Sequence, residues 1–334
     1  MWVRNMLELK DVFVARQNIG HLVRRTPLQA SPALSERVGS DVWLKLENLQ
    51  RTGAFKVRGA VNRVASLSAE ERVRGMVTAS SGNFAVGLAY AARALGGVPV
   101  SLFMPVGTPA SKVDKLREFD VEIFLSGEQY DNCFDDSKDY QREHGLAYAH
   151  SYEDLEIIAG QGTVGLEIME DLPDADAILV PIGGGGLLGG VTVAAKAINP
   201  GITIIGVQVE ASPSAYLSFK EGHCYERYEY DFTIAEGLAG GFGIVPFELV
   251  KDLIDDVVLV SEQEMREAVF TLLESEQLVV EGSGAVTVAA LLFDKVDLRG
   301  KKVVAVISGG NIDVSLLFEI LGEHLPRVEE GLGV

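Results

Sequence analysis

Short apolar runs alternate along the chain with segments in which apolar residues recur at helical spacing. Several of the runs are apolar throughout, which is typical of parallel strands that are covered on both faces. We predict strands at Val42–Leu46, Met76–Ala79, Val98–Met104, Val121–Leu125, Ala177–Ile182, Ile202–Val209, Val257–Val260 and Val303–Ile307.

The segments between these runs carry the helical pattern. We predict helices at Ala54–Leu67, Phe84–Leu95, Ala110–Phe119, Thr163–Glu170, Leu187–Ile198, Glu262–Gln277 and Ala285–Asp294. Alternation of strands and helices indicates an α/β protein with parallel sheets. The stretch Glu221–Gly243, rich in Tyr and Gly, has the least periodic pattern, and we expect it to wrap over the surface.

The composition is that of an ordinary globular protein. The 334 residues are 47% hydrophobic and 23% charged, which suits two domains or one large one with a core that needs no disulfide or metal. The formal net charge is −19. An acidic surface repels phosphate backbones, so we expect no nucleic-acid partner.

Three features bear on location. Cys133 and Cys224 match no metal or redox spacing, which fits a reducing compartment. The first residues, Met1–Glu8, lack the apolar core of a signal peptide. The longest apolar stretch, Leu278–Phe293, is too short to span a membrane and is interrupted by Glu281. We therefore expect a cytoplasmic protein without a membrane segment.

Three predicted strands end in loops rich in glycine and hydroxyl groups, and ligands of open α/β sheets bind at such carboxyl ends. The first loop is Ser80-Ser81-Gly82-Asn83. Its hydroxyls and backbone N–H groups suit an anion such as a small carboxylate. Ser or Asn here could equally serve as an ordinary helix N-cap.

The second loop, Gly183-Gly184-Gly185-Gly186-Leu187, lets backbone N–H groups converge on a phosphate without side chains in the way. Gly184, Gly186 and Gly189 also satisfy G-x-G-x-x-G, and Glu210 follows at the end of the next strand. This dinucleotide fingerprint keeps an NAD-dependent dehydrogenase as an alternative.

The third loop is Ser308–Asn311, which by itself is no more than a tight turn with a serine cap. A separate feature is Lys56, which we place in the first turn of a predicted helix. The helix dipole disfavours a cation there, so a neutral or covalently bound lysine suits the position better, although the effect is small.

The segment Ala54-Phe55-Lys56-Val57-Arg58-Gly59-Ala60 closely resembles the S-F-K-x-R-G-A segment of the pyridoxal-phosphate-dependent threonine/serine dehydratases. Other segments that resemble this family follow in the same order: Thr26–Leu28, Ser80–Asn83, Ala159–Thr163, Gly183–Gly186, Glu281–Ala285 and Ser308–Asn311. The ordered set spans about residues 20–320 and outweighs the dinucleotide fingerprint.

The resemblance implies a role for each matched residue. Lys56 would bind pyridoxal phosphate as a Schiff base and take the α-proton, and Asn83 would hydrogen-bond the 3′-oxygen of the ring. Gly183, Gly184, Gly185, Gly186 and Leu187 would hold the phosphate, and Ser308 would meet the pyridine nitrogen. Ser80, Ser81, Gly82 and Asn83 would receive the substrate carboxylate, with Ser81 also catalytic on the ring face opposite Lys56.

Two positions depart from the family pattern. Phe84 stands where the family usually has His after S-G-N, which we expect to change the polarity beside the carboxylate loop. Glu210 matches a cation-binding Glu of racemase-like relatives, but Tyr216 replaces the accompanying Asp. We therefore predict no metal site.

The resemblance implies fold type II, with two open, twisted, mostly parallel sheets flanked by helices. We expect residues 1–68 and 153–330 to form a large cofactor-binding domain and residues 69–152 a small one. The implied activity is elimination of water and ammonia from L-threonine or L-serine, in a homodimer. A serine racemase, a hydroxyaspartate or phenylserine dehydratase, and a non-catalytic amino-acid-binding protein are the alternatives besides the dehydrogenase.

Overall fold

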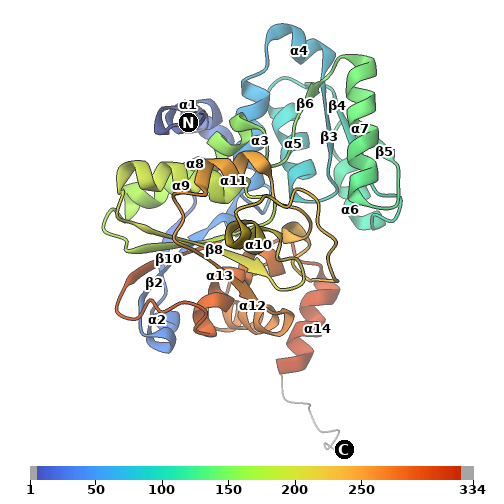
Figure 1. Cartoon of the computed structure of the whole chain (residues 1–334). Coiled ribbons are helices and arrows are strands. Elements are labelled where there is room, and N and C mark those ends of the chain that lie inside the picture. The colour runs from blue at the N-terminus through green and yellow to red at the C-terminus, as the bar shows by residue number, and fades with distance from the viewer. Residues whose placement is uncertain (1–5, 325–334) are drawn as a thin grey trace, which may run out of the picture.

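The computed structural model describes residues 6–324 and contains two separate sheets with helices on both faces of each (Figure 1). One sheet has six strands and forms the larger body of the molecule. The other has four strands and projects with its helices from the upper right of the view (Figure 1). The predicted fold class, two mostly parallel sheets flanked by helices, is confirmed.

The six-stranded sheet brings distant parts of the chain side by side. Its order is β1-β2-β10-β7-β8-β9, and only β1 is antiparallel to its neighbour. The strands are β1 (Leu28–Ala30), β2 (Asp41–Leu46), β7 (Ala177–Pro181), β8 (Thr203–Val209), β9 (Asp256–Val260) and β10 (Lys302–Ile307). Because β2, β10 and β7 are parallel neighbours, the loops after their carboxyl ends lie along one edge.

Helices cover both faces of this sheet, since successive strand residues point to opposite sides. Ile178 and Val180 pack with one set of helices, whereas Ala177 and Leu179 pack with the other. The first set is α1 (Leu9–Ile19), α8 (Leu155–Asp171), α9 (Gly186–Ile198), α10 (Ser214–Glu221) and α11 (Ile244–Val250); the second is α2 (Pro32–Val38), α12 (Glu262–Glu276), α13 (Gly282–Leu292) and α14 (Val314–His324).

The four-stranded sheet is wholly parallel, in the order β5-β4-β3-β6. Its strands are β3 (Met76–Ala79), β4 (Val100–Met104), β5 (Glu122–Leu125) and β6 (Ala147–Tyr148). One face packs on α3 (Lys56–Ala65), α5 (Asn83–Ala94) and α6 (Ala110–Arg117), and the other on α7 (Tyr130–His144); α4 (Ala69–Arg74) precedes β3.

All eight predicted strands are present, each with ends within two residues of the prediction. The short strands β1 and β6 were not predicted, nor were helices α1, α2, α4, α7, α10, α11 and α14. The predicted helix at Thr163–Glu170 was too short, because α8 begins at Leu155.

Glycines explain the wrong start of α8. Gly160 and Gly162 disfavour a helix by propensity, so the sequence pattern placed its start after them. In the structure, a Cβ on Gly160 would lie 2.6 Å from Cα of Gly59 in α3, and one on Gly162 would lie 3.0 Å from the carbonyl oxygen of Gly190 in α9. The missing side chains allow α8 to pack closely against both helices.

The stretch Glu221–Gly243 is irregular, as predicted, apart from a short 3₁₀ turn at Glu236–Leu238. Most of its residues are exposed or half-buried, as expected of a segment that wraps over the surface, but part of it enters the core. Ala235, Leu238 and Phe242 are buried and belong to the two cores of the six-stranded sheet.

Candidate active site

Three segments far apart in the sequence meet where β10 ends. The backbone N–H of Phe55 donates to the carbonyl of Ser308 at 3.0 Å, and that of Glu281 donates to the carbonyl of Gly309 at 3.1 Å. Lys56 follows Phe55 directly. The structure therefore brings the predicted lysine and the Ser308 loop together, and adds the start of α13 to them.

Lys56 is the first residue of α3 and is half-buried. Burial lowers the pKa of its amine to about 8, and the negative charge of Glu281 acts in the opposite direction. The lowered pKa thus arises from removal of water around the amine. A lysine with this pKa loses its proton much more readily than an exposed one, as a nucleophile or base requires.

Asn83, at the start of α5, ties the small sheet to this cluster. Its Nδ2 donates to Oε1 of Glu281 at 2.7 Å, and its Oδ1 accepts a hydrogen bond from Nδ2 of Asn311 at 2.7 Å. The same Asn311 nitrogen donates to the carbonyl of Thr52 at 2.9 Å. Asn83 therefore lies beside Glu281 in the same cluster as Lys56 and Asn311.

The loop Ser80–Asn83 is not closed by an ordinary N-cap. The N-cap of α5 is Gly82, and no side chain accepts a hydrogen bond there. Among residues 6–324, no acceptor is found for the backbone N–H groups of residues 81–85. These N–H groups and the half-buried Ser80 and Ser81 suit a small carboxylate.

The glycine run forms the N-terminus of α9, with Gly185 as the N-cap at φ 93°. Side chains in this run would collide with their surroundings: a Cβ on Gly185 would meet the ring of Phe242, and a Cβ on Gly184 the ring of Tyr152. A substitution at Gly185 would therefore disturb packing as well as any ligand.

The backbone N–H groups of residues 183–187 donate to no acceptor within the described part of the chain. Together with the positive end of the helix dipole, they provide a seat for a phosphate. Leu187 is buried behind this seat. The glycine run thus fits the phosphate of the cofactor that the sequence implies.

Ser308 is buried, and its hydroxyl donates to the carbonyl of Ser283 at 3.2 Å. The hydroxyl of Ser283 accepts a hydrogen bond from the backbone of Gly237 at 3.1 Å, and the carbonyl of Gly237 lies against Gly183. Ser283 therefore connects the Ser308 loop to the glycine run. A serine hydroxyl can rotate toward a ring nitrogen, so Ser308 fits its predicted role.

Phe84 lies behind the carboxylate loop, in the core. Its side chain is 2% exposed and packs in the apolar cluster between α3 and α5 that includes Val57, Val61 and Leu88. It therefore fills the core behind the carboxylate loop, and its effect on the polarity beside that loop stays a prediction.

Glu281 is the residue of this cluster that the sequence analysis missed as a site residue. Its segment was one of those that carry the resemblance, but a lone Glu before a helix gave no reason to assign it a role. Burial raises the pKa of its carboxyl to about 7, and the hydrogen bond from Asn83 only partly offsets this effect.

The region around Glu210 gives no cation site. Glu210 is exposed, and within residues 6–324 no group of three or more His, Cys, Asp or Glu side chains is arranged to hold a metal ion. The backbone N–H of Tyr216 donates to Gln208 at 3.1 Å. The absence of a bound cation stays a prediction.

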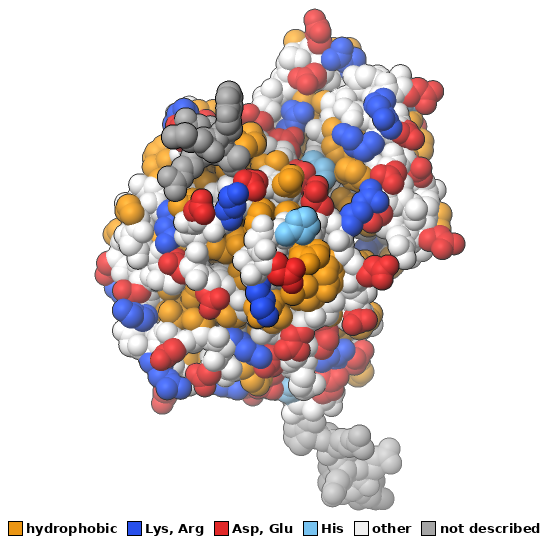
Figure 2. Space-filling model, viewed as in Figure 1, with side chains coloured by type: hydrophobic (Ala, Val, Ile, Leu, Met, Phe, Trp, Pro, Cys, Tyr) orange, Lys and Arg blue, Asp and Glu red, His pale blue; other side chains and the backbone are white. Residues whose placement is uncertain are grey.

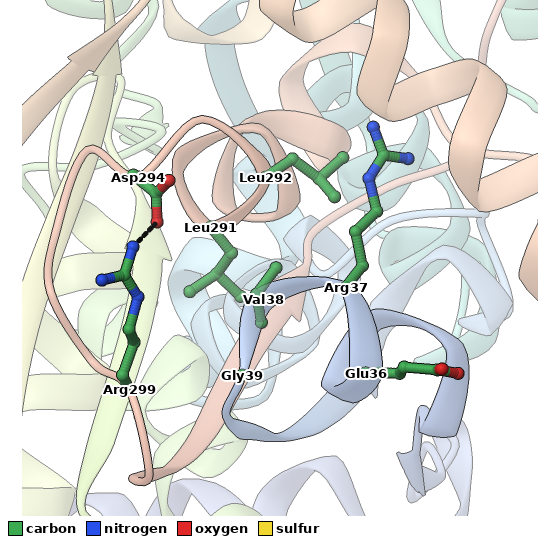
Figure 3. Close-up of a pocket in the computed structure, with 8 residues that line it drawn as sticks. All are labelled: Glu36, Arg37, Val38, Gly39, Leu291, Leu292, Asp294 and Arg299. Carbon is green, nitrogen blue, oxygen red and sulfur yellow. Dashed lines mark hydrogen bonds and ion pairs between the residues drawn. The ribbon is translucent and has the colours of Figure 1, made fainter.

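A pocket of about 310 Å³ lies elsewhere (Figure 3). It is polar, and Arg299 pairs across it with Asp294 at 3.3 Å. Gly39 and Arg299 come just before β2 and β10, so this pocket lies at the amino ends of the strands, opposite the candidate site.

The molecular surface carries both signs of charge. Lys and Arg side chains are scattered among Asp and Glu on the face in view (Figure 2). Of the helices described, none combines the length and apolar character that crossing a lipid bilayer requires. The two cysteines, Cys133 and Cys224, are free. The absence of a nucleic-acid partner stays a prediction.

The chain is similar to two named enzymes over nearly its whole length. It is 46% identical over 323 residues to an L-threonine ammonia-lyase of Thermotoga maritima, covering 96% of this chain and 80% of that one. It is 40% identical to the catabolic L-threonine dehydratase of Escherichia coli K12, covering 94% and 96% of the two chains.

A solved structure is similar to this chain over nearly the same length. The structure of maize serine racemase superposes with a TM-score of 0.89 at 35% identity, covering 95% of this chain and 98% of the other. Residues 19–309 match the family model described as pyridoxal-phosphate dependent enzyme. The cofactor prediction is confirmed, and the dehydrogenase alternative is set aside. The chain belongs to the family of pyridoxal-phosphate-dependent enzymes.

Proposed function

We propose that this enzyme is an ammonia-lyase that converts L-threonine or L-serine to a 2-oxo acid and ammonia. The observation that carries the proposal is the similarity to two relatives named for threonine deamination, at 46% and 40% identity over most of the chain. The cluster of Lys56, Asn83 and Ser308 at the carboxyl end of β10 supports it.

The residues that would hold the cofactor follow from this cluster. Lys56 would bind it covalently, Asn83 would face its 3′-oxygen, and Ser308 its ring nitrogen. The N–H groups of residues 183–187 would hold its phosphate. When bound, pyridoxal phosphate withdraws electrons from the α-carbon of an amino acid, which makes the α-proton removable.

The protein's own groups supply the rest of the chemistry. The amine of Lys56 would remove the α-proton, since burial keeps it easily deprotonated. The N–H groups at the start of α5, with Ser80 and Ser81, orient the substrate carboxylate. A hydroxyl at Ser308 holds the ring nitrogen less firmly protonated than a carboxylate would, which favours prompt elimination.

Substrate choice is tested by measuring ammonia release from L-serine, L-threonine, hydroxyaspartate and phenylserine with the purified, cofactor-loaded enzyme. We expect L-threonine or L-serine to have the highest kcat/KM, and the protein to absorb in the visible range. Highest turnover of hydroxyaspartate or phenylserine would contradict the proposed substrate. A colourless, cofactor-saturated protein without lyase activity would contradict the reaction class.

A racemase is the second candidate, favoured by the similarity to the maize serine racemase structure. Racemisation needs a group that returns a proton to the α-carbon from the face opposite Lys56, and we assign that role to Ser81. Elimination from an L-substrate needs no such group.

Ser81→Ala should therefore suppress formation and use of D-serine by about 10²-fold or more, while ammonia release from L-serine falls much less. Kinetics on both enantiomers, before and after the substitution, measure this difference. Ser80→Ala is the matched control, because it alters the same loop without removing the assigned proton donor. Equal losses on L- and D-serine would mean that Ser81 only positions the substrate.

The domain division is part of the proposal. The four-stranded sheet lies wholly within the proposed small domain, residues 69–152, which supports a division into that segment and residues 1–68 with 153–330. The homodimer and the cytoplasmic location stay predictions, and sedimentation of the purified protein would test the first.

A further inference from the structure

Glu281 occupies a position that the surrounding backbone leaves open for it. The carboxylate lies where a side chain on Gly309 would be, so a larger residue there would displace the carboxylate from this position. A Cβ on Gly284 would likewise meet the carbonyl of Gly309. Gly309 thus leaves room for this acidic side chain in the cluster that contains Lys56 and Asn83, and Gly284 lets the start of α13 pack against the backbone of Gly309.

The carboxylate is held on more than one side. Oε1 accepts the hydrogen bond from Asn83 Nδ2 at 2.7 Å, and a backbone hydrogen bond comes from Asn311. Asn83 is in turn held by Asn311 at 2.7 Å. The position of the carboxylate is therefore determined by the two asparagines, rather than by a flexible surface contact.

Charged groups from several elements face this site. Lys56 comes from α3, Lys112 from α6 and Glu236 from the 3₁₀ turn before α11, and each of them interacts electrostatically with Glu281. Lys112 is paired with Glu236 at 2.5 Å. His150 lies near Lys56 and Lys138, and burial and these two cations lower its pKa to about 4, so it is neutral at physiological pH.

Lys112 is already neutralised by Glu236, and His150 carries no charge. Within residues 6–324, neither Lys56 nor Glu281 forms an ion pair, and the negative charge of Glu281 raises the pKa of the Lys56 amine. We propose that Glu281 is a positioning residue whose negative charge holds the proton on the Lys56 amine and, through Asn83, fixes the amide that faces the cofactor. This inference rests on the proposed function of Lys56.

The pKa values support this proposal. Lys56 has a pKa of about 8 and Glu281 a pKa of about 7, so the two groups change protonation over nearly the same range of pH. When both are ionised, the carboxylate stabilises the ammonium. When Glu281 is protonated, that stabilisation ends and the pKa of Lys56 falls, so the amine loses its proton to solvent at a lower pH. The charge of Glu281 therefore sets the pH at which Lys56 becomes a free amine.

The test follows covalent loading of Lys56 as a function of pH. Full-length protein freed of cofactor is offered pyridoxal phosphate, the link is trapped with borohydride, and the labelled Lys56 peptide is quantified by mass spectrometry. In Glu281→Gln, which keeps an oxygen for Asn83 but loses the charge, the midpoint of loading should shift to lower pH by about one unit.

Two further variants serve as controls. Glu281→Asp retains the charge, so its midpoint should stay closer to that of the unmodified protein than the midpoint of Glu281→Gln. Glu236→Gln removes a carboxylate from the exposed partner of Lys112 and should leave the midpoint nearly unchanged. Circular dichroism confirms that each variant is folded.

Two outcomes separate this inference from the function on which it rests. If unmodified protein labels Lys56 but Glu281→Gln and Glu281→Asp both load with an unchanged midpoint, the inference is overturned and the proposed function stands. If the unmodified protein gives no label at Lys56, the proposed function fails, and the inference falls with it.

Discussion

Lys56→Ala should abolish ammonia release, with a loss of about 10⁴-fold or more, and should eliminate borohydride-trapped labelling by pyridoxal phosphate. The structure gives the reason. Lys56 is the amine at the start of α3, beside Asn83, Glu281 and Ser308, and burial has lowered its pKa to about 8. In the variant, no amine remains at that place to bind the cofactor covalently and to act as the base.

The matched control is Lys196→Ala. Lys196 lies near the other end of α9 from the glycine run and pairs with Asp255 at 2.9 Å. Its loss should leave turnover and labelling close to those of the unmodified protein. Near-normal elimination by Lys56→Ala, with circular dichroism unchanged, would contradict the assignment of Lys56.

The strands were predictable because their signal is local. Runs such as Val303–Ile307 and Ala177–Ile182 are apolar throughout, and their burial on both faces of the sheet explains why. The helix α7 was missed because its sequence is mostly polar: Cys133 and Ser137 are its only fully buried residues within the described structure. A helix with so narrow an apolar face gives little periodic signal.

The site was predictable only in part. The resemblance singled out Lys56 and Asn83, and the structure brings them to one cluster. The resemblance could not assign Glu281, whose proposed role depends on its contact with Asn83, 198 positions away in the sequence, at 2.7 Å. Nor could it place Phe84, because its burial is set by the packing of α5 on α3.

A second network, made of buried charges, holds the helix that carries Lys56. Arg58, two residues further along α3, is fully buried. Its Nε and Nη2 donate to the two oxygens of Glu47 at 2.8 Å each, and its Nη1 donates to Glu167 at 2.7 Å. Lys45, also buried, donates to Glu167 at 2.6 Å, and Thr26 donates to Glu47.

These charges balance, since two cations face two carboxylates. Burial alone would raise the pKa of Glu47, but the guanidinium of Arg58 and the ammonium of Lys45 hold it below 4.5. The network joins α3 to β2, which carries Lys45, and to α8, which carries Glu167. It therefore fixes α3 relative to the six-stranded sheet.

Arg58→Ala should lower the free energy of unfolding by about 3–5 kcal/mol, because it leaves buried carboxylates without their main partner. Urea unfolding at pH 7, followed by circular dichroism, measures the loss. The control is Arg299→Ala, whose exposed pair with Asp294 should contribute little. Adding Glu47→Gln to Arg58→Ala should restore part of the loss, since it removes one of the unpaired charges.

The loss of stability in Arg58→Ala should change with pH in a definite direction. In the unmodified protein the pKa of Glu47 is depressed on folding, so its contribution is present above 4.5 and is lost as pH falls through the folded value. Without Arg58 the buried carboxyl has a raised pKa and takes up a proton on folding. The deficit of Arg58→Ala should therefore shrink as pH is lowered from 7 toward 5. A deficit as small as that of Arg299→Ala, or one that grows on acidification, would show that the network does not stabilise α3 through these charges.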